Sequence, residues 1–396
     1  MNMHTADAPE VKPAQTLLVS NAVLPKSGGF PKTMRKFAVA LSAEIVSFTS
    51  PDESAEEREA FPEVTHVPTG RGFLSNWYSY AGKMARMPAE KMAGRVDLLS
   101  CHIMLRYHAT WVQRIARTHD IPYWFVAHGQ LDPYVYTYRS GIKRLWLNLY
   151  GRKLLERAAH VIFSTERERE KAKWFYEGAN TRVVHWPVDL IETDEKSNAR
   201  AWLRARLELE PSAQVLLYFG RLHTSKRPLE TIEAFAAAGV SGAHLVLVGP
   251  EGDVTLAACQ ECAGRLGIGS RVHPVGAVYG AEKNRFVLGA DAYISLSYKE
   301  NFGHTAAECL AAGTPVLLSP GNDLSPELEP VGCGWFLKTN RSDEAVDAIR
   351  SALCIGGDVR YAMGQRGRAF VRDECSEVGF AAALRALRDE AVANHR

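Results

Sequence analysis

Residues 292–318 read AYISLSYKENFGHTAAECLAAGTPVLL, and this stretch predicts a strand, a loop, a helix and a second strand in succession. The apolar run at 292–296 has the composition of a buried strand. The helix is expected to begin near Gly303–Thr305 and to end at Gly313, before the next strand at 315–318. Because the run is apolar at successive positions, it indicates a strand covered on both faces by helices. The stretch therefore predicts a parallel sheet with helical crossovers.

The same pattern recurs in two series along the chain. In the first half, strands are expected at 16–20, 44–48, 96–100, 123–127, 160–164 and 182–186. In the second half, they are expected at 214–219, 244–248, 272–275, 292–296 and 315–318. Two such series predict two doubly wound, Rossmann-like α/β domains that face an inter-domain cleft. Ligands of such sheets bind beyond the carboxyl ends of the strands, so functional residues are expected in the loops that follow them.

The division between the two series is expected near Pro187, because the polar stretch ETDEKSNAR at 192–200 has few apolar anchors. The first residues are expected to be disordered, and the last carry apolar side chains at helical spacing. The expected parts are a disordered N-terminus (1–14), a first domain (15–190), a second domain (200–372) and a C-terminal helix (376–392). The helix can cross back to the first domain.

The composition of the 396-residue chain is that of a globular protein, with 46% hydrophobic and 23% charged residues, which excludes a fibrous or mostly disordered chain. Lys and Arg number 47 against 45 Asp and Glu, and this balance does not indicate a nucleic-acid binder. No apolar run approaches the ~18–20 residues that span a bilayer, and the N-terminus does not read as a secretory signal. Seven cysteines, an odd number, indicate reduced thiols. We therefore expect a cytoplasmic protein.

Two glutamates flank the expected start of the helix: Glu300 lies in the loop before it, and Glu308 about one turn inside it. Unpaired N–H groups and the dipole at a helix start suit a phosphate or sugar hydroxyls. A carboxylate can accept two O–H hydrogen bonds from a diol such as ribose. Either glutamate alone is more often a solvated residue, but Glu-Asn-Phe-Gly with a second Glu eight positions after the first is more specific.

A second motif follows the strand at 214–219, where Arg221 and Lys226 share one loop. Arg offers bidentate hydrogen bonds to phosphate oxygens, and Lys adds a mobile point charge. Together they can neutralise a diphosphate leaving group as charge develops on it. Two basic residues in a loop are more often solvated surface, and the cleft shared with Glu300 favours the binding interpretation.

Two weaker signals lie in the first half. Gly28 and Gly29 precede a helix expected at 31–41, where glycines allow a close ligand approach to backbone N–H groups; an ordinary strand-to-helix turn fits equally. His128 follows the apolar strand at 123–127 and can hydrogen-bond a substrate or stabilise developing charge, although a lone His is often structural.

The second half resembles the nucleotide-binding domain of the retaining glycosyltransferases of family 4, which have the GT-B architecture. The motifs that carry this resemblance are Gly220-Arg221-Leu222 with Lys226, LVLVG at 245–249, Glu300-x7-Glu308 and AGTPV at 312–316. The first half is similar to the acceptor domains of bacterial exopolysaccharide and lipopolysaccharide enzymes of that family, through Gly28-Gly29 and HGQLDP at 128–133.

The resemblance implies roles for these residues. Glu300 and His128 would be the catalytic residues beside the donor sugar, and Glu308 would hold the ribose hydroxyls. The donor diphosphate would be held by Arg221, Lys226, Gly28 and Gly29. Further sugar and nucleotide contacts would come from Phe302, Gly303, His304 and Thr305. Gly321-Asn322 stands where many members have a Gly-Gly pair, so no role is carried over to Glu327.

The resemblance also implies an activity. It is the transfer of a hexose, with retention, from a UDP- or GDP-linked donor to a lipid-linked oligosaccharide or polysaccharide acceptor. No Asp-x-Asp occurs in the sequence, so we expect no metal and no other cofactor. A nucleotide-sugar 2-epimerase on the same scaffold and a non-catalytic nucleotide-sugar binder remain open as alternatives.

One basic segment in the first half has the composition of a membrane-surface helix. Residues 138–157, YRSGIKRLWLNLYGRKLLER, carry six basic residues and one acidic residue among apolar and aromatic positions. Such a segment can lie on the anionic cytoplasmic face of the inner membrane, or it can be a surface helix that packs its Trp and Leu inward. Cys259-x-x-Cys262 lacks a second pair at suitable spacing, which favours structural thiols over zinc.

Overall fold

The computed structural model of the chain describes residues 15–21, 23, 29–50, 52–70, 79–81, 95–137 and 140–395. The expected disorder of residues 1–14 and the predicted phosphate contact of Gly28 lie outside the described residues.

The described residues form two sheets in which every strand pairing is parallel. The first has the order β3-β2-β1-β4-β5-β6-β7. Its strands are β1 (Thr16–Asn21), β2 (Glu44–Thr49), β3 (Val64–Pro68), β4 (Leu98–His102), β5 (Tyr123–Val126), β6 (Val161–Phe163) and β7 (Thr181–Val183). The second has the order β10-β9-β8-β11-β12-β13. Its strands are β8 (Gln214–Phe219), β9 (Ala243–Val248), β10 (Val272–Gly276), β11 (Ala292–Ser295), β12 (Val316–Leu318) and β13 (Gly334–Phe336).

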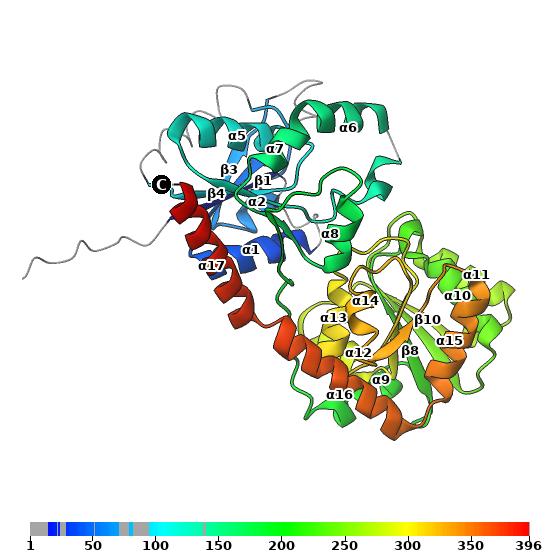
Figure 1. Cartoon of the computed structure of the whole chain (residues 1–396). Coiled ribbons are helices and arrows are strands. Elements are labelled where there is room, and N and C mark those ends of the chain that lie inside the picture. Colours follow the sequence, from blue (N-terminus) through cyan, green and yellow to red (C-terminus); the bar gives the residue numbers. More distant parts are fainter. Residues whose placement is uncertain are drawn as a thin grey trace, which may run out of the picture.

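Helices cover both sheets, as the continuous apolar runs predict (Figure 1). In the first half they are α1 (Phe30–Leu41), α2 (Ala55–Glu59), α5 (Tyr107–His119), η3 (Pro133–Tyr136), α6 (Ser140–Trp146), η4 (Leu147–Gly151), α7 (Arg152–Glu156) and α8 (Glu166–Ala172). In the second half they are α9 (Lys196–Arg206), η5 (Thr224–Lys226), α10 (Pro228–Ala238), α11 (Leu256–Arg265), η6 (Gly269–Arg271), α12 (Gly280–Gly289), α13 (His304–Ala311), α14 (Ser325–Leu328) and α15 (Ser342–Cys354). Two long helices follow, α16 (Gly357–Glu374) and α17 (Glu377–His395).

The strand order reverses direction beside β1 in the first sheet and beside β8 in the second. Such switch points open a crevice at the carboxyl ends of the strands. The loops after β5 and β11 meet there, since Lys299 Nζ donates a hydrogen bond to the carbonyl oxygen of Gly129 at 2.9 Å. The predicted architecture of two doubly wound domains facing a cleft is therefore confirmed.

The C-terminal helices tie the two halves together. Figure 1 shows α16 against the second half and α17 (red) running back along the first half beside α1. The Phe380 ring of α17 packs edge-on against Phe37 of α1, with 5.0 Å between the ring centroids. Arg385 Nε donates to the carbonyl oxygen of Ala40 at 2.7 Å. The predicted crossing of the C-terminal helix is confirmed.

Two edge strands, β3 and β13, were not among the expected strands. In β3 only Val64 and Val67 are buried, and in the three-residue β13 every residue is half-buried. Neither strand carries the continuous apolar run that marks a central strand. Edge strands need only one neighbour, so their sequences signal them weakly.

Cys259 and Cys262 are free, buried thiols on α11. Among the described residues, no group of three or more His, Cys, Asp or Glu is placed to hold a metal ion. None of the helices in the described ranges is long and apolar enough to cross a membrane.

Candidate functional site

The start of α13 lies at the carboxyl edge of the second sheet, after β11. Its cap residue Gly303 adopts φ 73°, and no side chain caps the helix. A Cβ on Gly303 would lie 2.5 Å from Asn322 Nδ2, so this tight left-handed turn requires glycine. The N–H groups of His304 and Thr305 have no intrahelical partner, and together with the helix dipole they suit an anion.

The two predicted loops meet beside this helix. Lys226, at the end of η5, forms an ion pair with Glu300 in the loop after β11. Ser297 Oγ lies 3.3 Å from the same carboxylate oxygen of Glu300. Both charged side chains are partly exposed, so a ligand that offers a stronger anion to Lys226 can replace this ion pair. Arg221, in the same loop as Lys226, is exposed.

Glu308, one turn inside α13, pairs with a residue that the sequence motifs did not indicate. Lys283 Nζ of α12 lies 2.5 Å from Glu308 Oε1. The Lys283 ammonium also lies 5.8 Å from the centroid of the Phe219 ring, at the end of β8. The pair therefore places one carboxylate and one cation at the same edge as Arg221 and Lys226.

His128 lies at the site on the side of the first sheet, close to His304. It follows β5 in a left-handed conformation, with φ 48°, and Gly129 continues the turn with φ 72°. His128 Nε2 lies 2.9 Å from His102 Nδ1, and the Phe30 ring packs edge-on against the His128 ring. Burial, with His304 nearby, lowers the pKa of His128 to about 3. The imidazole is neutral at physiological pH and can exchange hydrogen bonds with a sugar hydroxyl.

A buried carboxylate holds the turn that carries His128. Glu168 Oε1 accepts a hydrogen bond from the Gly129 N–H at 2.5 Å. Glu168 Oε2 accepts from the Ser164 N–H at 2.7 Å and from Ser164 Oγ at 2.8 Å. From the second half, Asn301 Nδ2 donates to Ser164 Oγ at 3.1 Å, and Lys299 Nζ donates to the Gly129 carbonyl. We call these five residues, Gly129, Ser164, Glu168, Lys299 and Asn301, the turn clamp.

Charged residues also join the two halves beside the turn clamp. Lys171 Nζ of α8 lies 3.0 Å from Asp132 and 2.6 Å from Asp323. Burial raises the pKa of Asp323 to about 7. His185 Nε2 lies 2.6 Å from Glu327 Oε2; burial lowers the pKa of His185, but the hydrogen bond and charge of Glu327 outweigh it and raise the pKa. Glu327 thus connects the two halves.

Both halves of the chain match models of known protein families. Residues 200–370 match the family model described as Glycosyl transferases group 1, and residues 28–192 match the model described as Glycosyltransferase Family 4. The chain is a member of the glycosyltransferases. Both halves carry the assignment, and the two matched ranges together span most of the chain.

Two relatives of this glycosyltransferase share the same name. A D-inositol 3-phosphate glycosyltransferase of Nocardia farcinica is 23% identical over 283 residues, which cover 69% of this chain and 62% of that protein. The chain therefore spans less than two thirds of that relative. A protein of the same name from Saccharomonospora viridis is 24% identical over 350 residues, covering 83% of this chain and 80% of that protein.

A solved structure supports the fold. The Anabaena protein HepE, in complex with UDP and glucose, superimposes with a TM-score of 0.74 at 17% identity, covering 94% of this chain and 98% of that chain. At this identity the likeness concerns the fold alone. The fold of this glycosyltransferase is GT-B.

The structure brings most of the predicted glycosyltransferase site residues to one edge of the cleft. Those from the second half are Arg221, Lys226, Glu300, Gly303, His304, Thr305 and Glu308. His304 Nε2 reaches the first half, 3.4 Å from Thr33 Oγ1. The Phe302 side chain is buried and packs against the His304 ring, so only its backbone is available to a ligand. Gly29 caps α1 with φ −73°, a conformation open to other residues, and a Cβ there would meet nothing within 4 Å.

Several residues at the site were not predicted: His102, Glu168, Lys283, Lys299 and Asn301. Lys299 and Asn301 flank Glu300, so the motif itself pointed to their loop. Thr165-x-x-Glu168 has the form of a capping box. The Thr165 side chain does cap α8, while the Glu168 carboxylate turns to Gly129, which lies far away in sequence.

Proposed function

We propose that the protein transfers a hexose from a UDP- or GDP-linked donor to an acceptor, with retention of the anomeric configuration and without a metal ion. One observation carries the proposal. The uncapped start of α13 lies between the Lys226–Glu300 and Lys283–Glu308 pairs, with neutral His128 close to His304. This arrangement presents positive charge for a diphosphate and carboxylates for hydroxyl groups.

The donor diphosphate lies at the N–H groups of α13, beside Lys226 and Arg221, in this proposal. Lys226 leaves Glu300 for the phosphate oxygens, and Glu300 is then free to accept hydrogen bonds from the sugar hydroxyls near the reacting carbon. Glu308 accepts hydrogen bonds from the ribose diol, as a carboxylate can. HepE is described in complex with UDP and glucose, which supports a UDP-linked donor.

The chemical step is a same-face attack of the acceptor hydroxyl on the anomeric carbon. The bond from that carbon to the diphosphate oxygen breaks, and the departing phosphate takes the acceptor proton. Lys226, Arg221 and the helix start stabilise the charge that develops on the leaving group, so no metal ion is required for that purpose. His128 donates or accepts a hydrogen bond at the sugar without changing its charge.

The acceptor is a lipid-linked oligosaccharide or polysaccharide in this proposal, as in exopolysaccharide or lipopolysaccharide assembly. Supporting it, α6 and η4 expose Leu145 (59%), Leu149 (54%) and Tyr150 (47%) beside basic residues, while Trp146 is buried. Apolar side chains among cations favour peripheral contact with an anionic membrane, here the cytoplasmic face of the inner membrane.

Vesicle binding tests this surface. Leu149→Ser should weaken co-sedimentation with phosphatidylglycerol vesicles several-fold, because it removes an exposed apolar contact. Val359→Ser, an exposed apolar site on α16, is the matched control and should leave binding unchanged. Equal binding by wild type and Leu149→Ser would contradict the membrane contact.

A second acceptor class is favoured by the names of the relatives, which are D-inositol 3-phosphate glycosyltransferases. Transfer assays with UDP- and GDP-hexoses, offering a polyprenyl-diphosphate-linked oligosaccharide or an inositol phosphate, separate the two acceptor classes. Epimerised donor without any acceptor would support a 2-epimerase, and donor binding without turnover would support a non-catalytic binder.

Thermal unfolding with UDP, GDP and their hexose forms, with and without EDTA, tests the donor site first. A ligand that binds only the native state raises the melting temperature. A selective shift with one nucleotide that survives EDTA is expected. The absence of any shift at millimolar ligand would contradict the assigned donor site.

A further inference from the structure

A cavity of about 270 Å³ opens at the opposite edge of the second sheet. Its wall includes Gln214 at the start of β8, Asp291 just before β11 and Pro315 just before β12. The donor-site loops follow the carboxyl ends of these same strands. Six residues of β8, at ~3.3 Å each, separate the two edges by about 20 Å. The cavity is therefore distinct from the proposed donor site.

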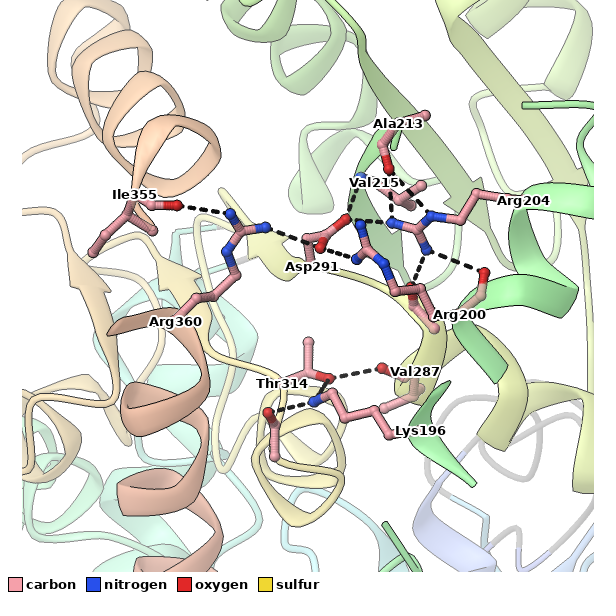
Figure 2. A network of polar contacts seen from close by, with 12 residues as sticks. Lys196, Arg200, Arg204, Ala213, Val215, Val287, Asp291, Thr314, Ile355 and Arg360 are labelled. Carbon is pink, nitrogen blue, oxygen red and sulfur yellow. Dashed lines mark hydrogen bonds and ion pairs between the residues drawn. The ribbon is translucent and has the colours of Figure 1, made fainter. Parts of the chain in front are cut away.

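Cations outnumber the carboxylate at this cavity. Figure 2 shows Arg200, Arg204 and Arg360 converging on Asp291, the one acidic residue among the described residues that line it. Arg204 Nη2 lies 2.5 Å from Asp291 Oδ2, Arg360 Nη1 lies 2.9 Å from Oδ1, and Arg200 also pairs with Oδ1. Three guanidinium groups thus share a single negative charge.

Lys196 adds a fourth cation on the far side of the cavity (Figure 2). Its ammonium donates to the carbonyl oxygens of Gly313 at 2.6 Å and Ala312 at 3.3 Å, and finds no carboxylate among these partners. Burial lowers the pKa of Lys196 to about 8, as expected for a cation short of negative charge. The acidic residue at the cavity whose charge acts on Lys196 is Asp291, and the three arginines already share that carboxylate.

An unpaired N–H group of Arg360 also favours an anion at this cavity. Arg360 Nη2 donates to the carbonyl oxygen of Ile355 at 2.8 Å, but its Nε is buried without a partner. A buried N–H without a partner is uncommon and calls for an acceptor. An anion beside the guanidinium of Arg360 supplies one.

The start of α16 adds N–H groups. This 18-residue helix begins at Gly357, which lines the cavity, and its cap residue Gly356 provides no side-chain cap. A Cβ at either glycine would meet nothing within 4 Å, so open space adjoins the first turn. The N–H groups of a first turn have no intrahelical partner and suit a phosphate.

We propose that this cavity binds a small phosphomonoester, with its phosphate group between Lys196, Arg200 and Arg360 at the start of α16. The cavity of about 270 Å³ has roughly nine times the ~30 Å³ that one water takes in the liquid. A phosphate group alone therefore does not fill it. Ser212 and Gln214 line the remaining wall and can hydrogen-bond sugar hydroxyls, and the half-exposed Arg200 borders the opening. The ligand class is a sugar phosphate.

Isothermal titration of the full chain with glucose 6-phosphate tests the proposal, with inorganic phosphate as the second probe. Arg360→Gln and Lys196→Gln should each weaken glucose 6-phosphate binding at least tenfold. Arg372→Gln is the matched control, because Arg372 lies on the same helix and pairs only with neighbouring Asp373 in the described contacts. Lys226→Gln, at the donor site, should leave this binding intact.

Three results would overturn the proposal: no binding to wild type at millimolar ligand, wild-type affinity in both cavity variants, or loss of binding in Lys226→Gln, which would place the anion at the donor site. Phosphate binding as tight as glucose 6-phosphate would overturn the sugar-phosphate class. If Arg360→Gln fails to fold, Arg200→Gln decides, since Arg204 and Arg360 still neutralise Asp291 in that variant.

Discussion

Glu168 accepts three hydrogen bonds with its two carboxylate oxygens, and each oxygen faces a backbone N–H group, which can only donate: Gly129 on Oε1 and Ser164 on Oε2. Burial raises the pKa of this carboxyl, while these hydrogen bonds oppose the rise. A neutral side chain of the same shape cannot satisfy the same donors, because a Gln amide presents N–H groups where one oxygen now accepts. The turn that carries His128 therefore depends on one charge.

Glu168→Gln should lower the free energy of unfolding by about 1–3 kcal/mol, the cost of leaving a buried donor unpaired. It should also lower kcat more than it raises KM, because His128 is mispositioned while the nucleotide contacts remain. Urea denaturation and transfer kinetics measure both effects. Glu170→Gln, on the same helix but exposed, is the control and should change stability by less than about 0.5 kcal/mol.

Glu308→Ala should weaken nucleotide binding about tenfold, because the ribose hydroxyls lose an ionised acceptor. The fold should persist, since Glu308 is partly exposed and its only described ion pair is with Lys283. Titration calorimetry with the nucleotide identified by thermal unfolding provides the measurement. Glu282→Ala, an exposed position on α12, is the control; equal nucleotide affinity in both variants would contradict the ribose role.

At the scale of elements, the strand–helix–strand unit from β11 to β12 was predictable because its information is local. A continuous apolar run, the uncapped turn at Gly303 and the helix end before Gly313 all lie within one stretch of sequence. Glu300 and Glu308 were predictable for the same reason. Lys283 was not, because its pairing with Glu308 arises from the packing of α12 beside α13. Glu168 was likewise hidden in a run of alternating charges.

The α17 crossing offers a test at the same scale. Phe380 is buried against Phe37 and Trp186, both edge-on. Phe380→Ala should lower the free energy of unfolding by about 3–5 kcal/mol, the usual cost of emptying a buried aromatic site. Val378→Ala, 82% exposed on the same helix, should cost less than about 0.5 kcal/mol. Urea denaturation compares the two, and a small effect at Phe380 would show that α17 packs only loosely.

At the scale of the whole molecule, the contacts between the halves carry a pH dependence. The pKa of Asp323 is about 7 in the folded protein, against an ordinary value of 3.8. Between these values the folded state binds more protons than the unfolded state, so this residue stabilises the fold at low pH. That contribution is lost as the pH rises through about 7.

Through Asp323, the unfolding free energy of the wild type should fall by up to about 1.4 kcal/mol per pH unit as the pH rises from 4 to 7. Asp323→Asn should abolish this part of the fall. Urea denaturation of the wild type and variant across this range gives the difference. The buried histidines contribute equally to both proteins, so they cancel in the comparison. Parallel curves would contradict the raised pKa of Asp323.

The return of α17 to the first half also affects how the protein is made. The first sheet is complete at Val183, yet the helix that covers Phe37 begins only at Glu377. At ~5–20 residues per second, a ribosome needs on the order of 10–40 s to reach that helix after the first sheet has emerged. During that interval the part of α1 that α17 covers is exposed, while the rest of its apolar face packs on the first sheet. The nascent first half is therefore a candidate for chaperone protection. A chain that ends before α17 would leave this apolar surface exposed and would be prone to aggregate.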